Sequence, residues 1–559
     1  MRRQLNNSSK IVLLLLTGLI LRINPILAVN LTPQQEQTLK SPEYNPGSLL
    51  MQRMKELQRY RNERDAKDMK ELPSEDDRSE NVESKPDVPD VSITLNRLDI
   101  PDSEVLSREE LDAVAQKYSG KNVTIAELYN AIDEINSLYF KKGYITTRAI
   151  LPPQKLEDNV VKVVLIEGKV GNVVVDNNKR TKSSYIKRFL KVPEGVVPNV
   201  NDIRRNIQKF NLTNKTLLQI KMVAGEKPMT TDFYIVALEP KSNRNTTIFT
   251  DNSGGENSGK YRYGLSYTDS NLSGRCDILS LSTLYSRTSE TGMLSYNTPV
   301  GFSGSRVSIS HNSNDMRVSK GYMKDLDVKG ESSNSTISFS KPIATNMNKR
   351  SELVVEAQKQ KSETRILGND FVKDRDKRYS VSYSETRIKG GSIFFIKPTY
   401  IYNEHKNIDG EHFYGDRVTL DTMWQKYRKK GDILTVRVSA QKDLEDYIPS
   451  ADQYYLGGQY SVRGYHENVI GGDAGVNAKI DYSFHTSKKG LNFVTFFDWG
   501  RLSGDTLLTT KEIYSAGFGF DYHKGNFSLS IYTGYPLKKK IGDEKVDKNV
   551  TNFVLSYSF

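Results

Sequence analysis

The chain is poor in several features that would define a common class of protein. It contains 1 cysteine, Cys276, and 2 tryptophans among 559 residues. A single cysteine excludes an intramolecular disulfide and any metal site built from several cysteines. Beyond residue 30, no apolar run approaches the roughly 18 residues that a membrane-spanning helix needs. If the chain spans a membrane, it must therefore do so as a closed β-barrel.

Charge of one sign is not concentrated anywhere either. Lys and Arg number 80 and Asp and Glu number 68, which gives a formal net charge of +12. This excess is spread along the chain and forms no basic cluster of the kind that binds nucleic acid, so no nucleic-acid partner is predicted. Tyrosine and phenylalanine are abundant instead, with 31 and 20 residues. The length allows more than one domain.

The N-terminus has the order of a secretory signal. Three basic residues precede an apolar run at 11–21, and Ala28 offers a small residue for cleavage. A membrane anchor is disfavoured, because the run has only about 11 residues and Arg22 follows it closely. We expect a signal peptide over residues 1–28, and hence an exported protein.

A long charged helix is predicted in the N-terminal segment, residues 29–72. It covers residues 48–72, where Ser48 can cap it and Pro73 ends it. At 1.5 Å per residue it is roughly 37 Å long, enough to cross a membrane inside a water-filled pore but too charged to cross in lipid. A plug inside a pore and a solvated coiled-coil segment both remain open. Residues 73–90, acidic and proline-containing, are predicted to be a disordered linker.

Two small α+β domains are predicted next, at 91–168 and 169–240. In the first, capping boxes at Ser107–Glu110 and Thr124–Glu127 open two helices, and Gly143 closes the second. Strands are expected at 91–95, 144–151 and 160–166. The second domain repeats the order, with strand 171–175, helices 183–190 and 200–210, and strands 216–223 and 232–238. Strands at a domain edge suit the binding of a peptide by strand addition.

The remainder, residues 245–559, has a period of two with an aromatic face. Phe553, Leu555, Tyr557 and Phe559 alternate with mainly polar residues, and Tyr261–Tyr267 shows the same pattern. In a soluble sandwich this face would be mostly Val, Ile and Leu, whereas tyrosines suit lipid-facing strands whose hydroxyls reach the membrane interface. Sixteen strands are predicted, an even number that lets the first pair with the last. They start near 246, 261, 276, 291, 304, 333, 351, 378, 392, 415, 433, 475, 491, 513, 525 and 551.

Several patterns that could indicate chemistry have a simpler interpretation. Gly254–Lys260 resembles a phosphate loop, but Tyr261 follows where Ser or Thr is needed and a strand follows where a helix is needed, so we predict a hairpin turn. The six histidines have no metal-ligand spacing. Acidic residues at 325–327 and 370–376 are expected in surface loops as solvated charge. No serine nucleophile elbow is present, and no enzyme, metal or cofactor is predicted.

Two segments carry the most information. The longest gap between predicted strands, 443–474, contains a compact turn with one cation, Arg463. On the strand near 491, Asp498 alternates with Phe497 and Trp499, so it faces the lumen if those rings face lipid. A carboxylate there needs a cation, and Arg463 could pair with it in bidentate geometry. Two unrelated surface residues remain the other interpretation.

These features together resemble the outer-membrane transporters of two-partner secretion, whose superfamily also includes the barrel-assembly insertases. In that family a Val-Arg-Gly-Tyr tetrad lies at the tip of the sixth loop, folded back into the barrel, and it matches Val462, Arg463, Gly464 and Tyr465. A Phe-x-Asp-x-Gly motif on the thirteenth strand matches Phe496, Asp498 and Gly500. The aromatic end, Phe559, resembles the signal that the barrel-assembly machinery recognises. One departure is in the strand after the loop, where Asn477-Ala478-Lys479 replaces the usual acidic residue that follows Asn.

The resemblance implies an N-terminal helix, two tandem POTRA domains in the periplasm and a 16-stranded barrel in the outer membrane. It implies a pore that moves a large unfolded exoprotein, of the haemolysin, adhesin or contact-dependent toxin type, to the cell surface without ATP. The expected partners are that exoprotein, captured by the POTRA domains, outer-membrane lipid, and the assembly machinery. A barrel-assembly or insertase factor is the alternative, although that class usually has three to five POTRA domains. A barrel enzyme and a diffusion porin are less compatible with the sequence.

Overall fold

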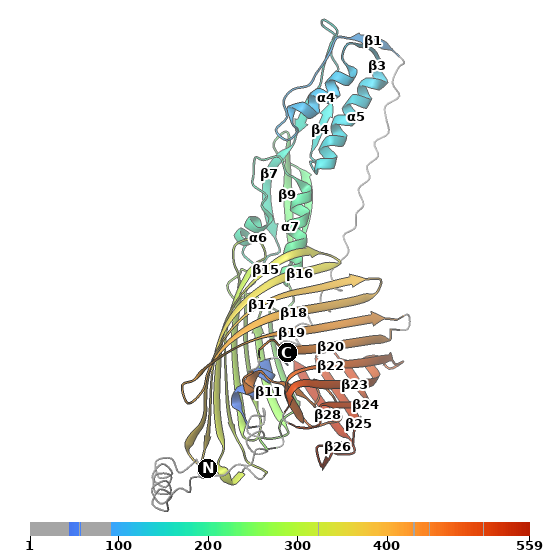
Figure 1. Cartoon of the computed structure of the whole chain (residues 1–559). Coiled ribbons are helices and arrows are strands. Elements are labelled where there is room, and N and C mark those ends of the chain that lie inside the picture. Colours follow the sequence, from blue (N-terminus) through green and yellow to red (C-terminus); the bar gives the residue numbers. More distant parts are fainter. Residues whose placement is uncertain are drawn as a thin grey trace, which may run out of the picture.

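The computed structural model describes residues 44–54, 56, 91–255, 257–321, 324–428, 431–445, 448–506 and 508–559. Two small α+β domains are stacked end to end on one rim of a β-barrel, and a short helix lies inside the barrel (Figure 1). The predicted signal peptide 1–28, the linker 73–90, and residues 55 and 57–72 of the predicted helix lie outside the described residues. No helix in the described part of the chain is long and apolar enough to cross a membrane.

The first small domain contains two helices held by the predicted caps. Both capping boxes are present, and Gly143 ends the second helix in the left-handed conformation. Strands β2 and β3 are additional to the prediction, because segments of three or four residues carry too little alternation to be recognised. The elements are β1 (Ser92–Leu95), β2 (Arg97–Asp99), α4 (Arg108–Tyr118), β3 (Lys121–Thr124), α5 (Ile125–Lys142), β4 (Thr147–Ile150), β5 (Val160–Lys162) and β6 (Val164–Glu167).

The second small domain matches its predicted elements closely. Its sheet has the order β7-β9-β8, so β7 and β8 are the edge strands. The helices cover one face, where the rings of Phe189 and Phe210 meet edge to face at 5.1 Å. The elements are β7 (Lys169–Asp176), α6 (Ser183–Leu190), α7 (Val200–Thr213), β8 (Leu217–Ala224) and β9 (Thr230–Leu238).

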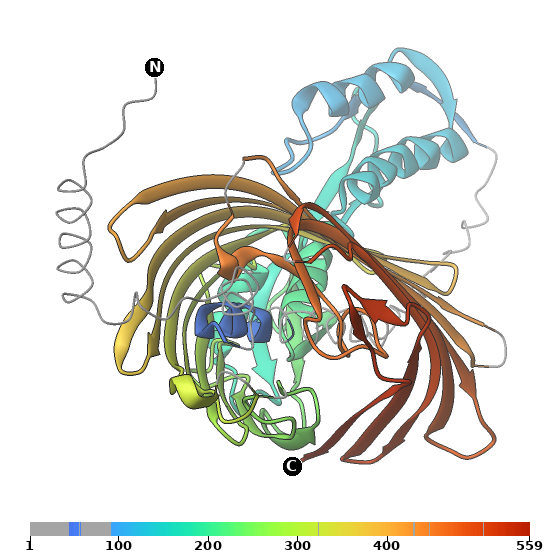
Figure 2. The same cartoon turned by 60° about the horizontal axis from the view of Figure 1, so that its bottom comes forward.

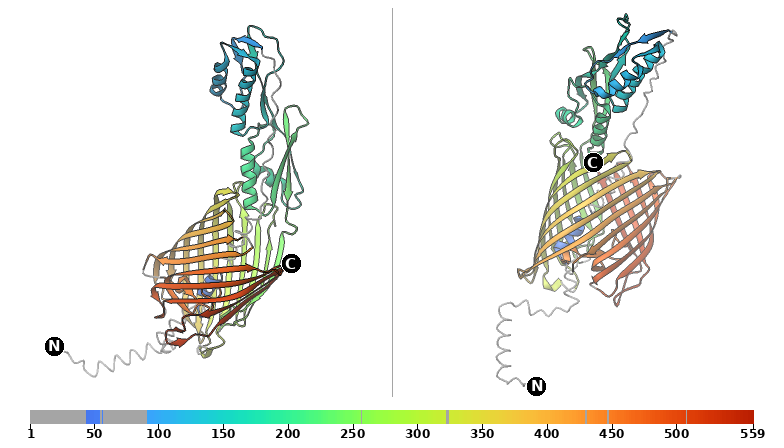
Figure 3. Two further views of the ribbon diagram at one scale, coloured as in Figure 1. Left: turned by 90° about the vertical axis from the view of Figure 1, so that its right-hand side faces the viewer. Right: turned by 45° about the horizontal axis from the view of Figure 1, so that its top comes forward.

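Sixteen strands in the described part of the chain close the barrel, as predicted. Neighbours in sequence pair antiparallel, and β10 pairs with β28 to complete the ring. Figure 3 shows the closed wall from two further sides. The strands are β10 (Arg244–Asp251), β11 (Arg262–Asp269), β12 (Ile278–Tyr285), β13 (Ser289–Pro299), β14 (Arg306–Arg317), β15 (Lys329–Asn346), β16 (Lys349–Ile366), β17 (Asn369–Lys389), β18 (Ser392–Lys406), β19 (His412–Tyr427), β20 (Ile433–Asp443), β22 (Ile470–His485), β23 (Leu491–Thr506), β24 (Glu512–Lys524), β25 (Phe527–Pro536) and β28 (Val550–Ser558).

The largest boundary error falls on β17, which starts at Asn369 rather than near 378. Asp370, Asp374 and Asp376 were placed in a surface loop but lie on this strand, and Asp376 is 1% exposed. The reason is that both faces of the strand are charged over this stretch, so no hydrophobic alternation marks it. The predicted turn at Gly254–Lys260 does connect β10 to β11, closed by a backbone hydrogen bond from Gly254 to Lys260 at 2.9 Å.

The barrel is apolar outside and polar inside. Outward side chains such as Tyr263, Phe520 and Tyr557 are exposed by 41–61%. Inward ones such as Gln360 and Asp498 are 0% exposed. Because successive residues of a strand point to opposite faces, this division follows from the period of two in the sequence.

The second small domain is docked firmly on the barrel rim. Cys276, in the turn between β11 and β12, belongs to the apolar core of that domain. Lys182 donates its backbone N–H to the carbonyl of Gly274 at 2.8 Å, and Asn271 Nδ2 donates to Thr181 Oγ1 at 2.9 Å. Burial raises the pKa of the Cys276 thiol to about 11, so the thiol stays protonated at neutral pH.

Candidate functional site

A long loop between β20 and β22 folds back into the lumen. It includes a single 3₁₀ turn, η4 (Ser450–Asp452), and the short strand β21 (Tyr454–Leu456), which pairs with the start of β22. Figure 2 shows this loop, in orange, inside the barrel beside the N-terminal helix. Strand β22 starts at Ile470 rather than near 475, because its first residues pair with β21 inside the pore.

Arg463 and Asp498 form a bidentate ion pair inside the barrel. Arg463 Nε donates to Asp498 Oδ2 at 2.7 Å, and Nη2 donates to Oδ1 at 2.7 Å. The backbone N–H of Arg463 also donates to Oδ2, at 3.0 Å. Asp498 is 0% exposed and Arg463 is 4% exposed. A planar guanidinium fits a carboxylate in this geometry, so the pair fixes both side chains and attaches the loop to β23.

Two further groups surround the same cation. Asp481 Oδ1 accepts from Arg463 Nη2 at 2.5 Å, and the guanidinium carbon lies 3.6 Å from the centroid of the Phe496 ring. Asp481 is directly opposite Phe496 in the β22–β23 ladder, and Lys479 is opposite Asp498. Asp481 was missed in the sequence, although its position on the strand before Asp498 and on the same face could have indicated it.

The remaining tetrad residues pack the loop tip against the wall. Val462 and Tyr465 are 0% and 1% exposed and lie in one apolar cluster with Leu456. The hydroxyl of Tyr465 donates to the carbonyl of Tyr514 at 3.0 Å. Burial of two large apolar side chains stabilises the loop in the lumen by several kcal/mol, about 1.5–3 for each.

Glycine is required where the tip touches the wall. Gly464 has φ +92°, and a Cβ there would lie 2.8 Å from the carbonyl carbon of Gly534. A Cβ on Gly500 would lie 3.1 Å from Val462 Cγ2. Both matched motifs therefore use glycine to let the loop approach β23 and β25 closely.

Asp452 forms a second anchor that no sequence pattern indicated. Arg378 Nε donates to Asp452 Oδ2 at 3.0 Å, and Arg417 Nη2 donates to Oδ1 at 2.8 Å. Gln441 Nε2 donates to the backbone carbonyl of Asp452 at 2.7 Å. The three ionised side chains are 1–4% exposed. The loop is thus held at two points, by β17 and β19 at Asp452 and by β23 at Arg463.

The N-terminal helix lies beside this loop in the lumen and is described for residues 46–54 and 56. Asn45 caps it, because Asn45 Oδ1 accepts the backbone N–H of Ser48 at 3.0 Å. The prediction that Ser48 is the cap is therefore wrong. Pro46 suits the first helical position since it has no N–H to satisfy, and the Ser48 hydroxyl donates to the carbonyl of Ser450 at 2.9 Å.

Polar contacts tie the helix to the wall and to the loop. The backbone N–H of Gly47 donates to Ser362 Oγ at 3.1 Å, and Ser332 Oγ donates to the carbonyl of Pro46 at 2.9 Å. Asn468 Nδ2 of the loop donates to Gln52 Oε1 at 3.0 Å. These are single hydrogen bonds, each with a net contribution of about 0.5–1.5 kcal/mol.

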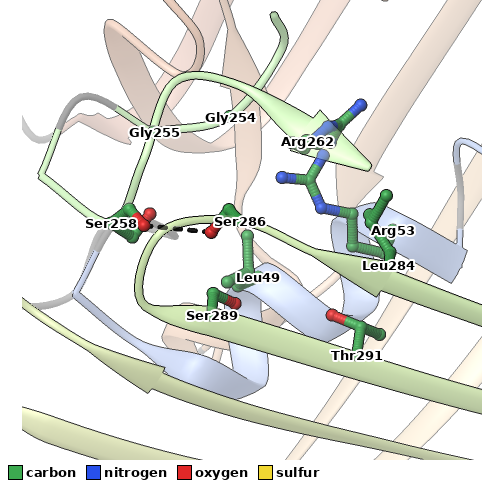
Figure 4. A pocket seen from close by; sticks show the side chains of 10 residues that line it. All are labelled: Leu49, Arg53, Gly254, Gly255, Ser258, Arg262, Leu284, Ser286, Ser289 and Thr291. Carbon is green, nitrogen blue, oxygen red and sulfur yellow. Dashed lines mark hydrogen bonds between the residues drawn. The ribbon is translucent and has the colours of Figure 1, made fainter. Parts of the chain in front are cut away.

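One face of the helix closes a small hollow in the wall. Leu49 and Arg53 face Arg262 and Leu284 there (Figure 4). Arg262 is already paired with Asp251, with Nε to Oδ1 at 2.6 Å. Arg262 Nη1 also lies 3.6 Å from Glu56 Oε2 of the helix. Without the helix, Arg262 would lose this longer contact and keep Asp251.

Phe559 lies at the rim, 66% exposed, with its ring 4.9 Å from that of Tyr557. Its backbone N–H donates to the carbonyl of Thr246 at 2.7 Å, which extends the closing ladder by one bond. Its role in assembly remains a prediction. Among the described residues, no three His, Cys, Asp or Glu side chains are placed to hold a metal ion.

Comparison with known proteins agrees with this architecture. Residues 231–522 match the family model described as haemolysin secretion/activation protein ShlB/FhaC/HecB, and residues 93–168 match the ShlB-type POTRA domain. The heme/hemopexin transporter protein HuxB of Haemophilus influenzae is 22% identical over 489 residues, 81% of this chain and 84% of HuxB. The outer membrane transporter CdiB of Dickeya dadantii is 22% identical over 479 residues, 79% of this chain and 83% of CdiB.

Two solved structures share the fold. CdiB from Escherichia coli has a TM-score of 0.68 at 18% identity and covers 92% of this chain and 98% of its own. CdiB from Acinetobacter baumannii has a TM-score of 0.67 at 18% identity with the same coverage. The family match selects secretion over the barrel-assembly alternative. The chain therefore belongs to the ShlB/FhaC/HecB family of haemolysin secretion/activation proteins and is an outer-membrane transporter of two-partner secretion, not an enzyme, with its POTRA domains in the periplasm.

Proposed function

We propose that this transporter threads one unfolded exoprotein through its own barrel, with the helix at 46–56 as a removable plug and the loop at 444–469 as a retained constriction. The exoprotein is of the haemolysin, adhesin or contact-dependent toxin type. No ATP is available outside the inner membrane, so folding of the exoprotein at the cell surface supplies the direction of movement.

The observation that carries the proposal is the contrast between the two segments that fill the lumen. The loop is held by buried ion pairs at Asp452 and Arg463 and by the apolar packing of Val462 and Tyr465. The helix has no bidentate ion pair to the wall among its described residues. It is held by single hydrogen bonds such as that of Gly47 to Ser362, by apolar packing of Leu49, and by one longer ion pair, Glu56 to Arg262 at 3.6 Å. Breaking a buried ion pair by removing one partner costs about 3–5 kcal/mol, whereas each hydrogen bond contributes about 1 kcal/mol and is replaced by water. The helix is therefore the segment that leaves.

Capture of the exoprotein is assigned to the second POTRA domain. Strand β8 is at the edge of its sheet, with no strand beyond it in the described part of the chain. Lys221 and Met222 are exposed there. An extended segment that adds to this edge gains main-chain hydrogen bonds with little dependence on its sequence, which suits a chain threaded residue by residue.

A reversible disulfide between helix and loop tests the plug. The side chains of Asn45 and Ser450 face each other, with Nδ2 and Oγ 3.1 Å apart. Asn45→Cys and Ser450→Cys would be combined with Cys276→Ser and co-expressed with a candidate exoprotein whose secretion depends on the unsubstituted chain. We expect the oxidised protein to leave the exoprotein in the periplasm and a reductant to restore its surface exposure. Each single-cysteine variant is the matched control and should secrete under both conditions.

Two results would contradict the proposal. Full secretion with the disulfide formed would show that the helix need not leave. Absence of the exoprotein from the surface with the unsubstituted chain would show that this exoprotein is not its cargo.

A further inference from the structure

A row of basic side chains crosses the outer wall of the barrel on four adjacent strands. Lys361 of β16 is opposite Arg375 of β17, Arg375 is opposite Lys406 of β18, and Lys406 is opposite His412 of β19. All four are exposed. Adjacent strands are about 4.8 Å apart, so the row spans about 14 Å. Strands β17, β18 and β19 lie side by side on the wall facing the viewer in Figure 1.

The row points away from the pore. The residues that alternate with it, Gln360, Asp376 and His405, are 0–3% exposed and face the lumen. Since side chains alternate along a strand, Lys361, Arg375 and Lys406 must project outward.

This arrangement lacks compensating charge on the protein. Like charges directly opposite each other in a ladder are destabilising. Among the described residues, Lys361, Arg375 and Lys406 have no ion-pair partner. The next row toward the periplasm contains a further like pair, Lys359 opposite Lys377, of which only Lys377 is neutralised, by Glu404 at 3.0 Å.

The level of the row relative to the membrane follows from the aromatic rings beside it. Tyr379 and Tyr402 stack with ring centroids 6.3 Å apart, and Tyr402 and Tyr414 with centroids 6.5 Å apart. Tyrosine rings on a barrel mark the interface between hydrocarbon and headgroups. Lys406 is the last residue of β18, at the end away from the POTRA domains. The row therefore lies just beyond the rings on the extracellular side, at the height of the outer-leaflet headgroups.

We propose that Lys361, Arg375 and Lys406 bind the phosphate groups of an anionic glycolipid of the outer leaflet. The guanidinium of Arg375 can chelate two phosphate oxygens, and the flanking ammonium groups supply point charges on either side. Binding of this lipid is a function separate from the secretion of the exoprotein. It would fix the orientation of the β16–β19 wall against the lipid and relieve the repulsion along the row.

The test uses the purified full chain in neutral detergent and lipid A that carries both of its phosphates. The variant combines Lys361→Gln, Arg375→Gln and Lys406→Gln. The control combines Lys389→Gln, Lys488→Gln and Lys489→Gln, three exposed lysines at the periplasmic rim. At about 1 kcal/mol for each basic group near a lipid surface, the variant should bind lipid A about a hundredfold more weakly, while the control binds like the original chain.

Two comparisons separate a lipid headgroup from other sources of the effect. Lipid A without phosphates should bind the original chain as weakly as it binds the triple variant. Inorganic phosphate at the same concentration should not displace lipid A. Far-UV circular dichroism checks that the variant barrel is folded, which we expect because the substitutions are on an exposed face. Unchanged lipid A binding by the folded variant, equal binding of dephosphorylated lipid A, or displacement by inorganic phosphate would each overturn the proposal.

Discussion

Removal of either partner in the Arg463–Asp498 pair should abolish secretion, but the two removals should not be equivalent. In Asp498→Ala, Arg463 keeps Asp481, whose Oδ1 is 2.5 Å from Nη2. In Arg463→Ala, Asp498 loses both side-chain hydrogen bonds and the backbone bond that depends on the docked loop. It then remains as a carboxylate at a position that is 0% exposed.

The burial of the ion pair determines how much each substitution destabilises the docked loop. Loss of one partner from a buried pair costs about 3–5 kcal/mol. We assign the upper end of this range to Arg463→Ala and the lower end to Asp498→Ala. The double variant removes both charges, so its cost should be no greater than that of Arg463→Ala alone, because residues in direct contact are coupled by about 0.5–3 kcal/mol.

Two measurements check this prediction. Surface exposure of the co-expressed exoprotein gives transport, and the gel shift between heated and unheated samples gives the folded fraction of the barrel. We expect secretion to be lost while the barrel still inserts and folds. Arg501→Ala is the control, because Arg501 is an exposed arginine on the same strand, three residues from Asp498.

The loss of secretion is compared on a logarithmic scale. If the loss in the double variant equals the sum of the losses in the two single variants, Arg463 and Asp498 do not act as a pair. Independent sites behave in that way, and a shared ion pair does not. The prediction is also refuted if Arg501→Ala abolishes secretion, since any loss of a wall charge would then suffice.

Two further predictions concern the second anchor and the capture of the exoprotein. Asp452→Asn leaves Arg378 and Arg417 buried without their shared anion, so the start of the loop and the helix bound to Ser450 should loosen. Single-channel conductance in planar bilayers should therefore rise. Unchanged conductance would show that Asp452 does not anchor the loop. A photo-crosslinking amino acid at Lys221, on the free edge of β8, should link to the exoprotein in the periplasm. The same group at Arg205, on the exposed side of α7, should not, and equal linking at both positions would argue against strand addition.

Much of the fold could be predicted because its signals are local. The capping boxes at Ser107 and Thr124 mark helix starts through hydrogen bonds within one turn, and both are formed. The aromatic alternation along β24 and β25 separates the outer face from the lumen without knowledge of any neighbour. Where the local signal vanishes, as on the doubly charged start of β17 at Asn369, the prediction failed.

The site could be predicted only in part. Alternation places Asp498 in the lumen, and the single cation in the long loop indicates Arg463 as a partner, although two unrelated residues fit the sequence as well. Asp452 could not be found in this way, because its partner Arg378 is 74 residues away in the sequence and reaches it only through a loop that turns back into the barrel. The same holds for Ser450, which meets Asn45 from 405 residues away.

By itself the sequence determined which residues form strands, which of their faces meets lipid, and that the ends of the sheet can join. These properties repeat every two residues and need no partner. The tertiary structure alone decided which side chains share a level on adjacent strands, including the row from Lys361 to His412 and the meeting of Asp452 with Arg378 and Arg417. The physical reason is that register depends on the lengths of all the turns and on the closure of the whole barrel, which no local pattern encodes.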